Sequence, residues 1–207
     1  MSGNTTSMDG LRAKADQGDQ ASQFQLGTAY DYGRGVTRNQ TEAAKWYLKA
    51  AEQGNAEAQN SLGSMFQYGE GLTQDNAEAL RWYQKAADQG HGEANANFGY
   101  MYDCGLGVTE DNEKAVRLYL IGVEKGSINA MFNLGICYWD GEGTPKDVVK
   151  GYMWLDLARF HTQRSPNMQL KWRIRGSLAE IAKEMTKDQI SEARKLGQEW
   201  DITHRLK

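Results

Sequence analysis

The residue patterns best suited to chemistry in this sequence are paired glycines and a few histidines. Gly33 and Gly35 form a Gly-x-Gly step, which can cradle phosphate where it joins a strand to a helix. Here the step joins two predicted helices and returns in every unit of a repeat, so we interpret it as a turn. His91, His161 and His204 are far apart in sequence, and no Cys-x-x-Cys or His-x-x-x-His pair accompanies them. The pattern predicts no metal site.

Motifs of covalent catalysis are also missing from the sequence. No Gly-x-Ser-x-Gly nucleophile motif occurs, although a catalytic site built from distant residues would leave no local pattern. Cys104 and Cys137 are too few for a disulfide framework, which favours free thiols and a reducing compartment. We expect a protein that is not an enzyme and that binds no cofactor and no metal.

Targeting signals are not visible in the chain. No stretch approaches the roughly 20 apolar residues of a membrane span, and residues 1–10 have neither a basic start nor an apolar run. As the sequence stands, these features favour a cytoplasmic protein. A periplasmic or secreted location stays open if a leader has been removed.

A 36-residue step runs through the sequence and defines the elements that would position any site. Glycines and aromatic residues both recur at this interval, as in the two sets Gly27, Gly63, Gly99, Gly135 and Trp46, Trp82, Leu118, Trp154. A fixed period of this size is typical of stacked repeat proteins, in which each unit buries its apolar face only against its neighbours.

Each unit is predicted to hold two helices joined by a glycine loop. In the second unit, an apolar stripe at three- and four-residue steps predicts a first helix over residues 56–68. Asp75 is placed to cap the second helix, and Glu78 three residues later completes a capping-box pattern. Gly90 can end that helix because glycine tolerates the left-handed conformation.

The registered pattern A-x-x-x-LG-x-x-Y-x-x-G-x-G-V-x-x-D-x-x-x-A-x-x-W-Y-x-x-A-A-x-x-G resembles the Sel-one-like repeat family, close relatives of the tetratricopeptide repeats. The second unit, AEAQNSLGSMFQYGEGLTQDNAEALRWYQKAADQG, matches it nearly throughout, and the resemblance covers about residues 15–158. In the fourth unit Gly151 replaces the helix alanine and Leu155 the tyrosine, which indicates that its outer face meets something other than another repeat.

The resemblance implies both a fold and a class of function. We expect an all-α protein, a right-handed α/α superhelical solenoid of four 36-residue helix-loop-helix repeats with a C-terminal capping helix pair at about residues 165–202. Family members act as scaffolds and adaptors in protein complexes, which favours protein or peptide binding and a bacterial source. The expected boundaries are 1–14 for an N-terminal tail and half-unit capping helix, 15–50, 51–86, 87–122 and 123–158 for the repeats, and 159–207 for the cap.

The first helix of each unit lines the concave side in superhelical repeats of this type. Amides there can hold a peptide backbone, carboxylates can select basic side chains, and aromatic residues can serve as anchors. For Phe132, Ile136 and Trp139, packing under the C-terminal helices is an equally open interpretation. Counted in register, the expected groove residues are Phe24, Asp31, Tyr32, Glu57, Asn60, Gln67, Tyr68, Glu93, Tyr100, Asp103, Asn129, Phe132, Ile136 and Trp139.

Charge is divided unevenly along the chain. Residues 1–158 hold 13 Lys and Arg against 21 Asp and Glu, a net of −8, whereas residues 159–207 hold 11 against 6, a net of +5. An acidic array disfavours nucleic acid and favours a partner with basic residues. The run Lys171, Arg173, Arg175 could contact an acidic partner or could be a solvated helix face.

Two other function classes remain open at this point. One is an envelope-associated protein that binds glycan or cell-wall fragments. The other is a hydrolase of the β-lactamase-like kind, because some relatives with a cysteine pair in each unit are linked to β-lactam binding. This chain lacks those pairs, so the resemblance does not carry that activity over.

Overall fold

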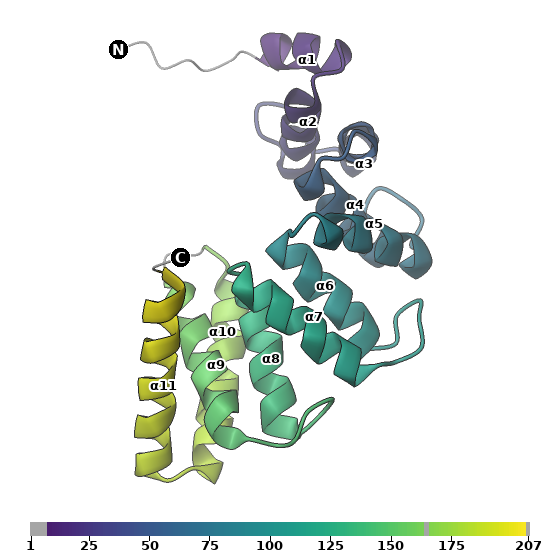
Figure 1. The fold of residues 1–207 in the computed structure, drawn as a ribbon. Helices are drawn as coiled ribbons and strands as arrows, with labels where there is room; N and C mark the ends of the chain where they lie inside the picture. Colours follow the sequence, from purple (N-terminus) through teal and green to yellow (C-terminus); the bar gives the residue numbers. More distant parts are fainter. Residues whose placement is uncertain (1–7, 164–165, 206–207) are drawn as a thin grey trace, which may run out of the picture. The chain divides into compact units, whose positions relative to one another are not determined.

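The computed structural model describes residues 8–163 and 166–205, and this part of the chain forms α-helices and one 3₁₀ turn with no β-strand (Figure 1). The predicted all-α class is confirmed. In chain order the elements are α1 (Met8–Asp16), α2 (Gln20–Tyr32), α3 (Gln40–Glu52), α4 (Ala56–Tyr68), α5 (Asn76–Asp88), α6 (Gly92–Asp103), α7 (Asn112–Glu124), α8 (Ile128–Asp140), α9 (Val148–His161), α10 (Met168–Ile181), the 3₁₀ turn η1 (Ala182–Glu184) and α11 (Lys187–Arg205).

The helices are distributed over two compact units, Met1–His91 and Gly92–Lys207. In the first unit α1 packs on α2, α2 on α3, α3 on α4, and α4 on α5. In the second unit α6 packs on α7, α7 on α8, and α8 on α9. Each repeat is therefore a pair of helices, and within each unit the successive repeat helices are packed neighbours, as in an α-solenoid. The first helix predicted over residues 56–68 is α4.

Each second helix is capped as predicted, but the capping box is wrong in its second half. Asp75 accepts hydrogen bonds from the amides of Ala77 and Glu78 at 2.9 and 3.0 Å. The amide of Asp75 donates to the Phe66 carbonyl at 2.9 Å, and Glu78 instead pairs with Arg81 at 2.6 Å. The bond from the Asp75 amide to the Phe66 carbonyl ties the two helices of a repeat together across the loop. It recurs at 2.8, 3.0 and 2.7 Å from Asn39 to Tyr30, from Asp111 to Tyr102 and from Asp147 to Tyr138.

The Gly-x-Gly step serves as a turn, as predicted. Gly69 ends α4 in the left-handed conformation with a φ of 70°, and its amide donates to the Met65 carbonyl. Gly71 also has a φ of 70°, and a Cβ atom there would overlap the backbone of Gln40 at the start of α3. Only glycine fits both positions, since a side chain would be strained at the first and would clash at the second.

The Leu-Gly pair brings the two helices of a repeat into close contact. A Cβ atom on Gly63 would lie only 2.7 Å from Cδ1 of Tyr83, whose side chain is buried on α5. The missing side chain lets the tyrosine ring lie directly on α4. Equivalent contacts are made by Gly27 with Tyr47, Gly99 with Tyr119 and Gly135 with Leu155.

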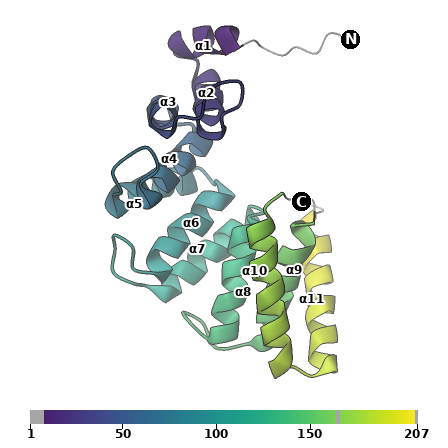
Figure 2. The same cartoon turned by 180° about the vertical axis from the view of Figure 1, so that it is seen from behind.

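Helix α1 stands where the half-unit capping helix is expected, and it covers the start of the first unit (Figures 1 and 2). Ala15 is buried with Leu26 and Trp46, and Leu11 packs against them. The Arg12 guanidinium donates to the Tyr30 hydroxyl at 2.5 Å. The apolar end of the first repeat is therefore covered by a helix of its own chain.

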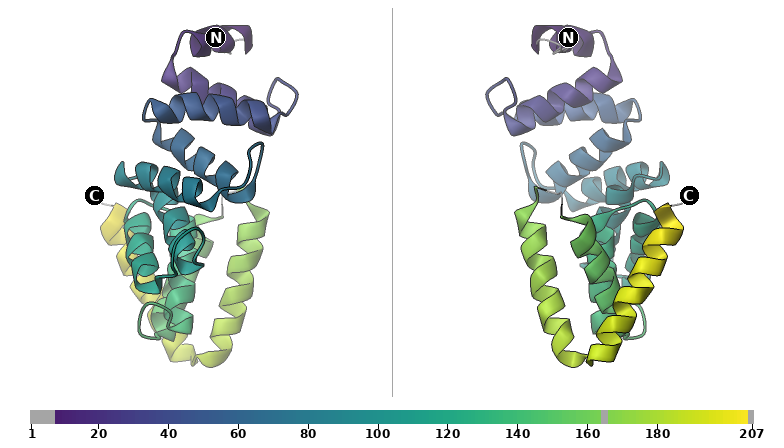
Figure 3. Two further views of the ribbon diagram at one scale, coloured as in Figure 1. Left: turned by 90° about the vertical axis from the view of Figure 1, so that its right-hand side faces the viewer. Right: turned by 90° about the vertical axis from the view of Figure 1, so that its left-hand side faces the viewer.

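The second unit ends in a cap in which α9 lies between α10 and α11 (Figures 2 and 3). Ile174 and Ile181 of α10 and Ala193 of α11 are buried in the same core as α9. A Cβ atom on Gly151 would lie 3.0 Å from Cδ1 of Ile181. Ile181 of α10 therefore packs directly on the glycine that stands where the other units have alanine. The predicted helix start at Ser165 lies outside the described residues, and α10 begins after the Asn167 cap.

Candidate functional site

A polar pair inside the repeats decides which first-helix residues stay available for binding. The Tyr83 hydroxyl donates to the Gln67 side-chain oxygen at 2.8 Å, and Gln67 is only 5% exposed. In the first repeat the Tyr47 hydroxyl donates to Thr28 at 3.3 Å and to Asp31 at 3.5 Å. Burial raises the pKa of Tyr47 to about 12, so this hydroxyl keeps its proton to a higher pH than an exposed tyrosine does. Gln67 is thus a core residue, whereas Asp31 stays partly exposed.

The first unit carries an open aromatic surface on its first helices. Tyr32 on α2 and Tyr68 on α4 hold the same register one repeat apart, and each is 65% exposed. The Arg34 guanidinium lies 5.0 Å from the Tyr32 ring centre. Glu57 is exposed and forms no hydrogen bond or ion pair within the described part of the chain, and Asn60 is half-buried.

An apolar hollow adjoins this surface between α1 and α2. It has a volume of about 320 Å³, and its lining residues include Met8, Leu11, Phe24 and Arg34. Phe24 is half-buried, and its ring centre lies 5.7 Å from that of Tyr47. Because Arg34 contacts both the hollow and the Tyr32 ring, the two features are continuous.

The first-helix carboxylates of the second unit are used within the unit. Glu93 on α6 accepts hydrogen bonds from Ser127 at 2.9 Å and from Asn129 at 2.7 Å, and so joins α6 to the start of α8. The Asp103 carboxylate accepts from the Tyr119 hydroxyl at 3.1 Å. Burial raises the pKa of the Asp103 carboxyl, and its contact with Tyr119 engages it within the unit. Tyr100 lies on the same helix and is 37% exposed.

The aromatic cluster of the fourth repeat is covered. Of the two interpretations that the sequence leaves open, the structure shows packing under the C-terminal segment. Phe132 is 4% exposed, with the Arg173 guanidinium 4.6 Å from its ring centre. The Trp139 indole N–H donates to Glu184 at 2.8 Å, and Ile136 packs against the core. These three side chains do not form an open anchor for a ligand.

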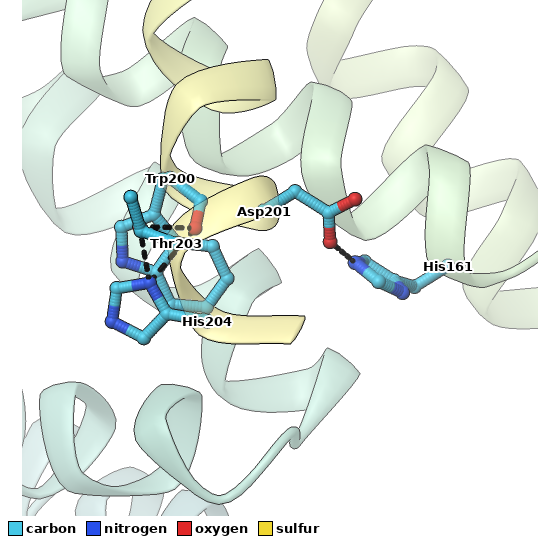
Figure 4. Close-up of polar contacts among 5 residues, drawn as sticks. All are labelled: His161, Trp200, Asp201, Thr203 and His204. Atoms are coloured by element: carbon cyan, nitrogen blue, oxygen red, sulfur yellow. Dashed lines mark hydrogen bonds and ion pairs between the residues drawn. The ribbon is translucent and has the colours of Figure 1, made fainter. Parts of the chain in front are cut away.

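Two histidines fasten the last helix to the rest of the second unit (Figure 4). His161 on α9 lies 3.1 Å from the Asp201 carboxylate on α11. His204 stacks on Trp200 with ring centres 4.0 Å apart, and its Nε2 lies 3.1 Å from Glu124 of α7. Sequence reasoning does not find these contacts, because no motif links residues 40 and 80 positions apart.

The repeat region matches a known protein family. The family model described as "Sel1 repeat" matches residues 20–55, 56–91, 92–127 and 128–159. These matches follow the four helix pairs α2/α3, α4/α5, α6/α7 and α8/α9. The chain belongs to the Sel1 repeat family.

Solved Sel1 repeat structures resemble the chain over most of its length. The crystal structure of a protective antigen present in uropathogenic Escherichia coli strains, which displays an SLR fold, has 31% sequence identity and a TM-score of 0.81. The match covers 93% of this chain but only 40% of the antigen chain. A Sel1 repeat protein from Oxalobacter formigenes has 31% sequence identity and a TM-score of 0.69. The match covers 83% of this chain and 77% of the Oxalobacter formigenes chain.

A more distant match supports the fold alone. The crystal structure of a Sel1 repeat protein from Klebsiella pneumoniae has 19% identity and a TM-score of 0.57, with 89% of this chain and 96% of that chain covered. No curated protein matches the chain. The solenoid fold expected from the repeat pattern is therefore confirmed.

Family membership bears on function at a general level. Sel1 repeat proteins are generally protein–protein interaction scaffolds and generally non-catalytic. Among residues 8–163 and 166–205, no group of three or more His, Cys, Asp or Glu side chains is arranged to hold a metal ion. No helix in this same part of the Sel1 repeat chain is both long and apolar enough to cross a bilayer.

Proposed function

We propose that this Sel1 repeat chain is a protein- or peptide-binding scaffold, without catalytic activity of its own, and that it binds through the first helices of its first unit. The observation that carries the proposal is the open surface formed by Tyr32, Tyr68 and the hollow around Phe24. Exposed aromatic side chains beside an apolar hollow are typical anchors in protein interfaces. We call these residues, together with Asp31 and Glu57, the first-unit face.

The ligand that suits this face carries basic and apolar side chains. Glu57 and the partly exposed Asp31 supply negative charge, and the repeat region as a whole is acidic. The hollow around Phe24 accepts an apolar side chain, a role that the fourth-repeat cluster cannot fill because Phe132 is buried. A segment with Lys or Arg beside a leucine-sized residue therefore matches the face in charge and in shape.

The test uses a fluorescein-labelled peptide of alternating lysine and leucine, with its glutamate and leucine counterpart for comparison. Replacing both Tyr32 and Tyr68 by alanine should weaken binding of the lysine peptide about tenfold or more, because anchor residues commonly contribute 2 kcal/mol or more. Leu48→Ala is the matched control, since Leu48 is also exposed but lies on the second helix α3.

Reversal of the charge of Glu57 tests whether this residue acts at the rim of the interface, where charge changes the association rate more than the affinity. Glu57→Lys should slow association and reduce its salt dependence, whereas Glu52→Lys on α3 should change neither by more than about twofold. If the tyrosine variant binds the lysine peptide as tightly as the parent does, the first-unit face is not the recognition surface.

A further inference from the structure

A basic cavity lies between the end of α9 and the start of α10 in the second unit. It has a volume of about 320 Å³ and is lined by Arg159, Thr162, Gln163, Lys171 and Arg175. Three of these five residues are cations, and no carboxylate lines the cavity among the described residues. A concave site with this lining suits a single anionic group.

The cations of this cavity are only partly neutralised by the protein itself. Arg159 pairs with Asp156 at 2.8 Å. The Lys171 ammonium donates to the backbone carbonyl of Gln163 at 3.1 Å, which leaves its charge uncompensated. Arg175 is exposed and has no hydrogen bond or ion pair within residues 8–163 and 166–205. Two positive charges therefore remain available to a ligand.

An apolar ridge adjoins the cavity on α10. Trp172 is 67% exposed and Met168, one helical turn earlier, is 55% exposed. Residues three or four apart on a helix are neighbours, so Trp172 lies beside Arg175 and next to the stripe formed by Lys171 and Arg175. From residue 166 to residue 179 the chain has three basic residues and no acidic one. The ridge and the cavity therefore form one basic and apolar surface, which we call the cap face.

We propose that the cap face binds an acidic protein segment, with one carboxylate in the cavity and an apolar side chain on Trp172 and Met168. This site is separate from the first-unit face and has the opposite charge preference. An anionic membrane suits the cap face less well, because each basic residue near such a surface contributes only about 1 kcal/mol and the cavity holds only two uncompensated ones, Lys171 and Arg175. A small concave site also favours a discrete carboxylate over a flat surface.

The test measures binding of the fluorescein-labelled glutamate and leucine peptide to the full chain. The double variant Lys171→Glu with Arg175→Glu should weaken this binding about tenfold or more. Trp172→Ala should weaken it about three- to tenfold. All three residues are at least partly exposed, and unchanged thermal unfolding should show that the fold is kept.

The matched control is the double variant Lys187→Glu with Lys195→Glu, which makes the same change in net charge on exposed residues of α11. It should bind the glutamate peptide within about twofold of the parent. The lysine peptide should bind the cap-face variants as it binds the parent, so failure of one proposed site is distinguishable from failure of the other.

Three results would overturn the proposal. The first is that the parent chain does not bind the glutamate peptide. The second is that the α11 control loses as much affinity as the cap-face variant, because binding would then depend on net charge alone. The third is that vesicles of phosphatidylserine and phosphatidylcholine bind in a manner that requires Lys171 and Arg175 while the peptide does not.

Discussion

Substitution of Gly63 by alanine tests the close helix contact on which every repeat depends. The added Cβ atom would lie 2.7 and 2.8 Å from Cδ1 and Cε1 of Tyr83, well inside the 3.5–4.0 Å or so of a normal carbon contact. The ring cannot swing aside without loss, because Tyr83 is buried and its hydroxyl donates to the buried Gln67. The substitution must therefore separate α4 from α5 or displace the ring.

The magnitude follows from two opposing effects. Overpacking in a core costs about 1–3 kcal/mol, and loss of the buried Tyr83 hydrogen bond adds to that cost. Alanine in place of glycine inside a helix returns about 1 kcal/mol. We expect Gly63→Ala to lower the free energy of unfolding by about 1–2 kcal/mol.

Gly176→Ala provides a matched control with the opposite sign. Gly176 lies within α10, is exposed, and a Cβ atom there would have no neighbour within 4 Å. The same chemical change should therefore stabilise the protein by about 0.5–1 kcal/mol. Thermal and urea unfolding followed by circular dichroism measures both variants. If Gly63→Ala also raises the melting temperature, the tyrosine ring is not held against α4 as described.

Two further predictions concern titration and reactivity. Burial raises the pKa of Tyr47 from about 10 in the unfolded chain to about 12 in the folded protein. The unfolded state therefore loses this proton first. The free energy of unfolding should fall as pH rises from about 10 to 12. The difference in absorbance at 295 nm between the parent and Tyr47→Phe, recorded with circular dichroism, should show this tyrosine ionising only as the helices are lost. Its ionisation near pH 10 in a folded chain would contradict its burial. Cys104 is exposed, whereas Cys137 is buried and its pKa is raised by burial to about 12. Iodoacetamide should therefore modify only Cys104 in the native protein. Equal labelling of both cysteines, measured by mass spectrometry, would refute the packing around Cys137.

The sequence predicts the fold well because the residues that make each helix contact recur in every repeat. Helix α4 has its predicted bounds, and Asp75 caps α5 as expected. The capping box fails because the Asp75 amide has a better partner, the Phe66 carbonyl across the loop. That bond depends on the tertiary arrangement of the two helices, which local pattern rules do not include.

The candidate site is less predictable, because register alone does not tell a buried position from an open one. Gln67 and Tyr68 are neighbours on α4, yet the first is a core residue and the second is open to solvent. The Phe132 ring lies under the guanidinium of Arg173, a residue of the cap that is outside the repeat pattern. Arg159 lies on a different helix from Lys171 and Arg175, and only the packing of α9 and α10 brings the three residues to one cavity.

The placement of α9 between α10 and α11 limits how this protein could gain or lose repeat copies. Within each unit a second helix packs on the first helix of the next repeat, α3 on α4 and α7 on α8, so a duplication of 36 residues there would meet surfaces of the same kind. A copy added after α9 would meet a surface that the cap already covers, because Ile181 packs on Gly151 and Trp200 contacts Trp154. Changes in copy number are therefore compatible with the packing only upstream of the fourth repeat, and the last repeat and its cap must be inherited as one block.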